Sequence, residues 1–236
     1  MSVFAGLVEW LADLLQPLFH ASATAAAIVL FTALVRLLVH PLSRAAARGQ
    51  QARARLQPEI AELRRKHAKD PVKLRRAVLD LHARERVTPF AGLLPSLLQA
   101  PAFFLLYHLF SSTTIGGEGN DLLTHTLFSA PLGDRWADAL GHGGLLGPAG
   151  LVYLGLFAFV AAVAAFTFHR ARRTTAESVA LAGEGEQVPG LGAVAKVMPF
   201  LSFLTLVTVA VVPLAAALYM VTSTTWSAVE RAVLYR

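Results

Sequence analysis

An arginine stands inside a long apolar stretch of this chain. Arg36 lies within residues 24–42, where almost every other side chain is hydrophobic. Thr32, Arg36 and His40 follow one another at intervals of four residues, which places them on one face of a helix. A guanidinium in such surroundings is costly unless it faces water or protein, so the pattern predicts a functional positive charge that attracts anionic groups. The competing interpretation is that Arg36 reaches the lipid headgroups as an ordinary anchor.

Polar side chains in the other apolar segments are candidates to share a cavity with this charge. No acidic residue stands in residues 24–42, 89–111, 148–168 or 197–229. A cation among hydroxyls and amides, without a carboxylate, favours a hydrated positive groove over a buried ion pair. The alternative for any single Ser or Thr is that its hydroxyl takes part in ordinary packing between helices and not in a groove. The expected groove residues are Arg36, Thr32, Ser96, Gln99, Thr205 and Thr222.

The composition is that of a membrane protein. Of 236 residues, 55% are hydrophobic and only 15% are charged, which excludes an ordinary soluble enzyme. The net charge of +6 indicates anionic lipid or RNA as a neighbour. The chain has no cysteine, hence no disulfide and no thiolate ligand, and no metal-binding or catalytic motif stands in it. We therefore expect a protein that is not an enzyme and needs no cofactor and no metal.

A helix needs about 20 apolar residues to cross a bilayer, and five windows of the sequence approach that length. They are residues 24–42, 89–111, 148–168, 197–212 and 213–230. The segments outside them are residues 1–23, 43–88, 112–147, 169–196 and 231–236. Residues 1–23 have hydrophobic side chains at helical spacing and predict an amphipathic helix on the membrane surface. The expected fold is all-α: a polytopic five-helix membrane bundle with an N-terminal amphipathic helix and a cytoplasmic helical hairpin.

The basic residues predict the orientation of the chain. Residues 43–88 hold thirteen of the 21 Lys and Arg, and residues 169–196 hold four more, whereas residues 1–23 hold none. Because Lys and Arg are retained on the cytoplasmic side, both basic segments should be cytoplasmic. The N-terminus and the Gly-rich loop 112–147 are then outside, and the C-terminus, residues 231–236, is inside.

Residues 43–88 are patterned as well as basic. One apolar stripe consists of Leu56, Ile60 and Leu63, and a second of Leu74, Val78 and Leu81. Lys69-Asp70-Pro71 separates the two stripes, so the segment predicts two amphipathic helices joined by a tight turn. In the loop 112–147 we expect a short interfacial helix over residues 122–128. Residues 169–196 are expected to form a cytoplasmic loop that is flexible and solvated around residues 176–189.

Several stretches together resemble the YidC/Oxa/Alb family of membrane protein insertases, in a short form similar to its Gram-positive members. The run Thr32-Ala-Leu-Val-Arg36-Leu-Leu-Val-His40-Pro41-Leu42 is similar to the family's first span. Residues 88–101, Thr-Pro-Phe-Ala-Gly-Leu-Leu-Pro-Ser-Leu-Leu-Gln-Ala-Pro, resemble its signature at the start of the second span. Met198-Pro199-Phe200 and the stretch from Pro213 to Trp226 resemble the closing pair of spans.

The resemblance implies a chaperone and insertase for nascent membrane proteins in the bacterial plasma membrane. Its hydrophilic groove would be open to the cytoplasm and to lipid, with Arg36 as its positive charge. The implied partners are nascent membrane proteins, anionic lipids and, through the 43–88 hairpin, the ribosome, the Sec translocon and the signal recognition particle receptor. No specific nucleic acid sequence is implied. The alternatives are a small transporter or channel for an anionic solute, and a membrane-anchored scaffold that acts through the basic hairpin.

Overall fold

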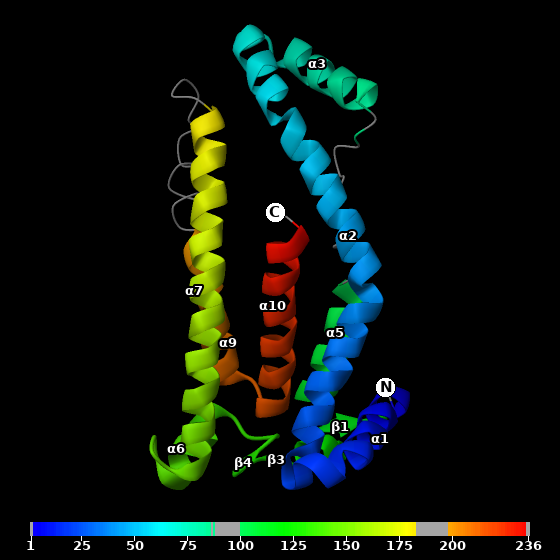
Figure 1. Cartoon of the computed structure of the whole chain (residues 1–236), viewed down its shortest axis with the longest axis vertical. Helices are drawn as coiled ribbons and strands as arrows, with labels where there is room; N and C mark the ends of the chain where they lie inside the picture. The colour runs from blue at the N-terminus through cyan, green and yellow to red at the C-terminus, as the bar shows by residue number, and fades with distance from the viewer. Residues whose placement is uncertain (1, 86, 88–99, 183–197, 235–236) are drawn as a thin grey trace. The chain divides into compact units, whose positions relative to one another are not determined.

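The computed structural model describes residues 2–85, 87, 100–182 and 198–234, which are mostly helical (Figure 1). The chain forms two compact units. The first, here called the bundle unit, comprises Met1–Leu38, Pro101–Phe168 and Phe200–Arg231. The second, here called the hairpin unit, comprises Val39–Ala100, His169–Pro199 and Ala232–Arg236.

Helices make up most of the described residues. They are α1 Ser2–Phe19, the 3-10 helix η1 His20–Ser22, α2 Ala23–Lys66, α3 Pro71–Arg84, α5 Ala100–Ser111, the 3-10 helix η2 Asp121–Leu123, α6 Trp136–Gly143, α7 Pro148–Ala182, the 3-10 helix η3 Met198–Phe203, α9 Leu204–Val211 and α10 Leu214–Leu234. Four two-residue strands form two antiparallel hairpins, β1 Thr114–Ile115 with β2 Glu118–Gly119 and β3 Thr126–Leu127 with β4 Ala130–Pro131.

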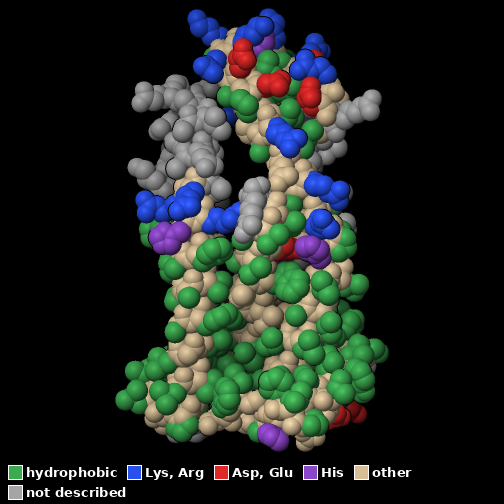
Figure 2. Space-filling model, in the orientation of Figure 1, with side chains coloured by type: hydrophobic (Ala, Val, Ile, Leu, Met, Phe, Trp, Pro, Cys, Tyr) green, Lys and Arg blue, Asp and Glu red, His purple; other side chains and the backbone are tan. Residues whose placement is uncertain are grey.

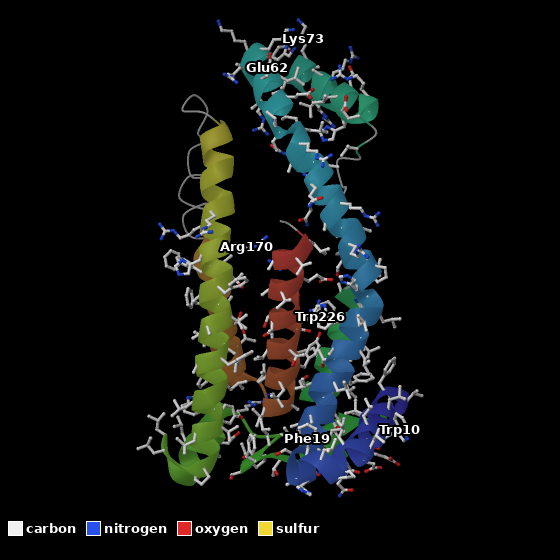
Figure 3. The ribbon with its side chains drawn as sticks, in the orientation of Figure 1. Trp10, Phe19, Glu62, Lys73, Arg170 and Trp226 are labelled. Carbon is white, nitrogen blue, oxygen red and sulfur yellow. The ribbon has the colours of Figure 1, made fainter. Side chains whose placement is uncertain are left out.

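Helix α1 presents apolar side chains on two of its faces. Ala5, Val8, Leu11 and Ala12 are buried in the bundle unit. A second apolar stripe is exposed, and it consists of Val3, Leu7, Trp10, Leu14 and Leu18 (Figure 3). His20 ends the helix because its φ of 48° lies in the left-handed region, where an α-helix cannot continue. An exposed apolar stripe with Trp on a short helix is typical of a helix that lies in a membrane interface.

The first turn of α10 lies in the centre of the bundle unit. Ala215, Ala216 and Ala217 have no exposed surface. The first backbone N–H groups of a helix have no partner within it. Here the N–H of Leu214 donates to the carbonyl of Asp134 at 2.9 Å, and that of Ala215 donates to the carbonyl of Leu132 at 2.9 Å. The loop before α6 thus caps α10.

The segment 122–128 corrects the sequence prediction of a short helix. Only Asp121–Leu123 is helical, as a 3-10 turn, and Thr126–Leu127 is a strand. The N–H of Leu132 donates to the carbonyl of His125 at 2.8 Å, and the N–H of Gly133 donates to that of Leu123 at 3.0 Å. The carbonyls of Leu123 and His125 thus pair with residues that follow β4, so they do not take part in a helix over residues 122–128.

The visible face of the bundle unit is largely apolar (Figure 2). On α7 and α9, six large hydrophobic side chains are about half or more exposed: Leu151, Phe159, Phe166, Leu204, Val207 and Val211. Two helical stretches of the described residues, Val3–Lys66 and Pro148–Arg173, are long and apolar enough to cross a membrane. The chain is therefore an all-α membrane protein. The expected number of five spans stays a prediction.

Two helices extend further than the hydropathy pattern indicates. Helix α2 continues through Pro41, where the first span was expected to end, as far as Lys66. Helix α7 continues past Phe168 to Ala182, into the segment 169–196 that was expected to form a loop. The residues from 169 to 182 include neither Gly nor Pro, so no helix-breaking residue interrupts α7.

In the hairpin unit, the second part of α2 packs against α3. Leu56 and Ile60 of α2 and Leu81 of α3 are buried together, and Leu63, Val78 and Val87 pack against them. Lys and Arg are frequent on the visible surface of this unit, with Asp, Glu and hydrophobic side chains among them (Figure 2). Asp70 begins α3, because its Oδ1 accepts a hydrogen bond from the backbone N–H of Lys73 at 3.0 Å and Pro71 occupies the first helical position.

We expect this turn to weaken in acid. The hydrogen bond from the Lys73 backbone, and then the Lys73 side chain, hold the pKa of the Asp70 carboxyl below its ordinary value. A carboxyl with a lowered pKa stabilises the fold above its ordinary pKa, and this contribution is lost as the pH falls through the lowered value. Hydrogen exchange of residues 71–84, corrected for intrinsic rates, should therefore show less protection below pH 4.

Two variants separate the charge of Asp70 from its capping oxygen. Asp70→Ser keeps an oxygen that caps α3, so protection of residues 71–84 should be retained and should no longer fall in acid. Asp70→Ala should lower protection at every pH. Equal protection of these residues in wild type and Asp70→Ala would show that the cap does not stabilise α3.

Candidate functional site

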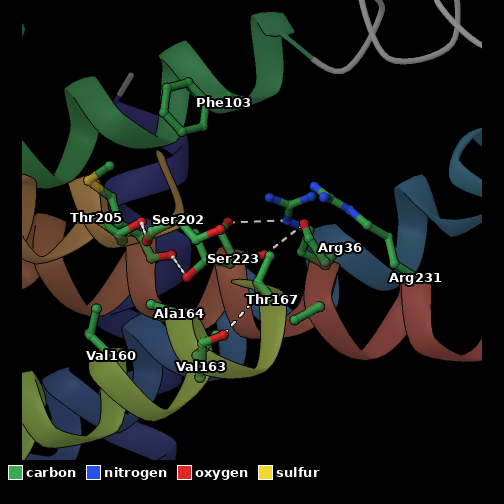
Figure 4. A pocket seen from close by; sticks show the side chains of 14 residues that line it. Arg36, Phe103, Val160, Val163, Ala164, Thr167, Ser202, Thr205, Ser223 and Arg231 are labelled. Carbon is green, nitrogen blue, oxygen red and sulfur yellow. Dashed lines mark hydrogen bonds between the residues drawn. The ribbon is translucent and has the colours of Figure 1, made fainter. Parts of the chain in front are cut away.

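A cavity of about 180 Å³ lies in the bundle unit (Figure 4). Arg36 of α2 and Phe103 of α5 contribute to its wall, together with residues of α7, η3, α9 and α10. Six of its described lining residues carry hydroxyls: Thr167, Ser202, Thr205, Ser223, Thr224 and Ser227. Two are arginines, Arg36 and Arg231, and the others are apolar. None of the described residues that line it is acidic.

Arg36 is positioned by α10. Its Nε donates a hydrogen bond to the Oγ of Ser223 at 3.1 Å, and its side chain is partly buried (Figure 4). A helix that places a guanidinium against a serine hydroxyl fixes the charge in position without neutralising it. The cavity wall therefore carries this positive charge.

Three of the lining hydroxyls donate to backbone carbonyls three or four residues earlier in the chain. The Oγ1 of Thr205 donates to the carbonyl of Ser202 at 3.2 Å, that of Thr167 to Val163 at 2.9 Å, and the Oγ of Ser227 to the carbonyl of Ser223 at 2.9 Å. Because the hydrogens of these three hydroxyls are engaged, their oxygen lone pairs are left to accept hydrogen bonds. The cavity thus combines acceptors from hydroxyls with donors from arginines.

Of the predicted groove residues, Arg36 and Thr205 both line this cavity. Thr32 has no exposed surface, and its hydroxyl donates to the carbonyl of Ile28 at 2.7 Å. Thr222 is partly buried, and its hydroxyl donates to the carbonyl of Leu218 at 2.8 Å. Neither is among the residues that line the cavity. Ser96 and Gln99 lie outside the described residues.

Helix α10 contributes more to the cavity than its sequence alone suggested. Six of its residues line the wall, at the helical spacing i, i+3, i+4, i+7, i+8 and i+11: Met220, Ser223, Thr224, Ser227, Ala228 and Arg231. The sequence does contain a pattern that indicates this wall, namely a stripe of hydroxyl side chains that ends at an arginine. Arg231 is also one of the basic residues that predict the cytoplasmic side, so its position in the sequence did not assign it to the site.

The apolar outer surface and the charged, hydroxyl-lined cavity define a helical membrane protein. The family model described as 60Kd inner membrane protein matches residues 15–236, and the chain belongs to this family.

Curated relatives carry the name membrane protein insertase YidC. That of Clostridium perfringens is 40% identical over 110 residues, which are 47% of this chain and 43% of the relative. That of an Anaeromyxobacter species is 41% identical over 81 residues, 34% of this chain and 15% of the relative. That of Geobacter sulfurreducens is 31% identical over 106 residues, which are 42% of this chain and 20% of the relative. The match spans less than half of each of these relatives.

Proposed function

We propose that this chain is a membrane protein insertase. The cavity receives the polar segment of a nascent membrane protein, while the adjoining apolar segment passes along the outer face of the bundle unit into the bilayer. Membership of the 60Kd inner membrane protein family and the names of the relatives support this function.

One observation carries the proposal: the cavity offers hydrogen-bond donors and acceptors together. The guanidinium of Arg36 binds carboxylates and peptide carbonyls, and the hydroxyl oxygens accept from peptide N–H groups. A polypeptide presents both kinds of group along its backbone. A site for a small inorganic anion needs donors alone, so this lining favours an insertase over an anion transporter.

The two surfaces of the bundle unit suit the two parts of a client. A polar segment in hydrocarbon leaves its backbone groups unsatisfied at a cost of several kcal/mol each, as an order of magnitude. The hydroxyls and Arg36 lower that cost at the cavity wall. The exposed side chains of Val207 and Val211 offer an apolar transmembrane segment a surface like that of lipid.

The proposed topology has five spans, the N-terminus outside and the C-terminus in the cytoplasm. The hairpin unit then presents its basic helices to the cytoplasm, where they attract anionic lipids. The ribosome, the Sec translocon and the signal recognition particle receptor are the proposed protein partners of this hairpin. Nascent membrane proteins are the proposed clients.

Single cysteines test this topology directly, because the chain has none of its own. We expect Gln57→Cys to react with a membrane-impermeant maleimide only from the cytoplasmic side, and Ser129→Cys only from outside. Both positions are exposed. Permeabilised membranes, in which both should react, are the control. Reaction of the two cysteines from one and the same side would rule out the proposed orientation.

Reconstitution of the chain alone in liposomes tests the function. A small single-span client should acquire a protease-protected segment in the presence of the chain and remain accessible in its absence. The same vesicles, loaded with chloride or phosphate, test the alternative function of an anion transporter. Anion flux without client insertion would favour a transporter and contradict the proposal.

A further inference from the structure

We propose that a second cavity of the bundle unit, at the bend between α1 and α2, binds an ethanolamine phospholipid through the ammonium group of its headgroup. The cavity has a volume of about 350 Å³ and is lined by residues of α1, η1, α2 and the loop before α6. It shares none of its described lining residues with the cavity at Arg36. The inference therefore goes beyond the proposed function and does not depend on it.

The bend between the two helices forms this cavity. The 3-10 helix η1 turns the chain from α1 into α2. The N–H of Phe128 donates a hydrogen bond to the Oγ of Ser22 at 3.0 Å, so the loop before α6 is tied to the bend. Leu122 and His125 contribute the part of the wall that belongs to this loop.

Two carboxylates give the wall a negative charge. Glu9 and Asp13 are four residues apart, so they stand on one face of α1, and both line the cavity. Residues 1–23 contain no Lys or Arg, and none of the described lining residues is Lys or Arg. Within the described part of the chain, no basic side chain forms an ion pair with either carboxylate. A cation that enters the cavity therefore meets two acceptors and displaces no resident positive charge.

A buried hydroxyl in the same wall indicates a ligand with hydrogen-bonding groups. Thr24 is only 3% exposed and lines the cavity. No described residue forms a hydrogen bond with its hydroxyl, whereas the buried hydroxyl of Thr32, further along α2, donates to the carbonyl of Ile28. A buried polar group without a partner is unfavourable, and a bound polar ligand removes this cost.

The placement of the side chains favours an organic cation over a metal ion. Among the described residues, no three His, Asp or Glu side chains are placed so that they could hold a metal ion together. An ammonium group has no such coordination requirement, because it donates three separate hydrogen bonds. The volume of about 350 Å³ leaves room for the rest of a headgroup.

The exposed apolar stripe of α1 places this cavity beside lipid. Trp10 and Leu14 of that stripe directly follow Glu9 and Asp13 in the sequence (Figure 3). A helix of this kind lies at the boundary between headgroups and acyl chains, so its polar face meets headgroups. An ethanolamine headgroup brings N–H donors to the two carboxylates, and its phosphate accepts from the hydroxyl of Thr24. A choline headgroup has no N–H donor, which makes it the natural comparison.

Competition between two lipids tests the assignment. The purified full chain is equilibrated in mixed micelles with equal amounts of phosphatidylethanolamine and phosphatidylcholine of the same acyl chains, and the bound lipids are counted by native mass spectrometry. The wild type should retain the ethanolamine lipid in preference. The double substitution Glu9→Gln with Asp13→Asn should lower that preference about tenfold, as expected for the loss of charge-assisted hydrogen bonds. Thr24→Val should lower it by a smaller factor, because it removes one neutral hydroxyl.

Glu118→Gln with Asp121→Asn is the matched control. It removes two exposed carboxylates that do not line the cavity, so the lipid preference should stay that of the wild type. Thermal unfolding in detergent verifies that each variant is folded. If the double substitution at Glu9 and Asp13 is not folded, the single substitutions Glu9→Gln and Asp13→Asn provide the same test, and each should lower the preference.

Three outcomes overturn the proposal. The first is equal retention of the two lipids by the wild type. The second is an unchanged preference when Glu9 and Asp13 are substituted. The third is binding of a soluble lysine-containing peptide that depends on the two carboxylates while the ethanolamine lipid shows no preference, since the cavity would then be a site for peptides and not for lipid.

Discussion

Replacing Arg36 by alanine is expected to lower the insertion of clients with acidic translocated segments about tenfold or more, since a hydrogen bond to a charged group contributes roughly 1.5–3 kcal/mol. Clients with neutral translocated segments should be affected much less. The reason is that Arg36 acts through its charge at a cavity whose described lining has no carboxylate. The measurement is protease protection of acidic and neutral clients in the same liposomes.

Conservative and neighbouring variants separate charge from packing at this position. Arg36→Lys should keep part of the activity, because it retains the charge but lacks the planar guanidinium. Ser223→Ala should have a smaller effect than Arg36→Ala, because it removes the group that positions the guanidinium and leaves the charge. Equal insertion of acidic and neutral clients by Arg36→Ala, at equal protein levels, would contradict the proposed role of Arg36 in the groove. It would favour the interpretation that Arg36 anchors the helix to lipid headgroups.

The largest loss of stability is expected at the first turn of α10. Ala216 has no exposed surface, so Ala216→Leu forces extra methyl groups into the packed centre of the bundle unit. Overpacking of this kind costs about 1–3 kcal/mol. Thermal unfolding in detergent should show a clearly lower midpoint for this variant.

Ala162→Leu is the matched control, because Ala162 is exposed on α7 and the added side chain there meets no packed neighbour. Its unfolding midpoint should stay close to that of wild type. If both substitutions have the same effect, burial at α10 does not decide the stability of the bundle unit.

Much of the helical framework could be predicted from hydropathy, because long apolar runs have few alternatives to helices in a membrane. The two stripes around Leu56 and Leu81 likewise predict the buried contact in the hairpin unit. The loop before α6 could not be predicted in this way. Its strands and its 3-10 turn depend on backbone pairs with residues that follow several positions later, such as Leu132 with His125.

For the candidate site, the sequence indicated the charge but not its neighbours. Arg36 stands out because a charged side chain inside an apolar span is costly and usually has a function. Thr32 shares its helix face by spacing, yet it is fully buried and its hydroxyl donates to the carbonyl of Ile28. Ser223 was one of four consecutive hydroxyl residues, and only the packing of α10 against α2 distinguishes it from Thr222.

Cysteine cross-linking between the chain and a stalled client tests the central claim most directly. Ser227→Cys lies in the cavity wall, and Val207→Cys lies on the exposed outer face of α9. A cysteine in the client's polar segment should form a disulfide with position 227 and not with position 207, and a cysteine in its apolar segment should show the reverse. If the polar segment fails to link to position 227 while the client still inserts, its path does not lead through this cavity.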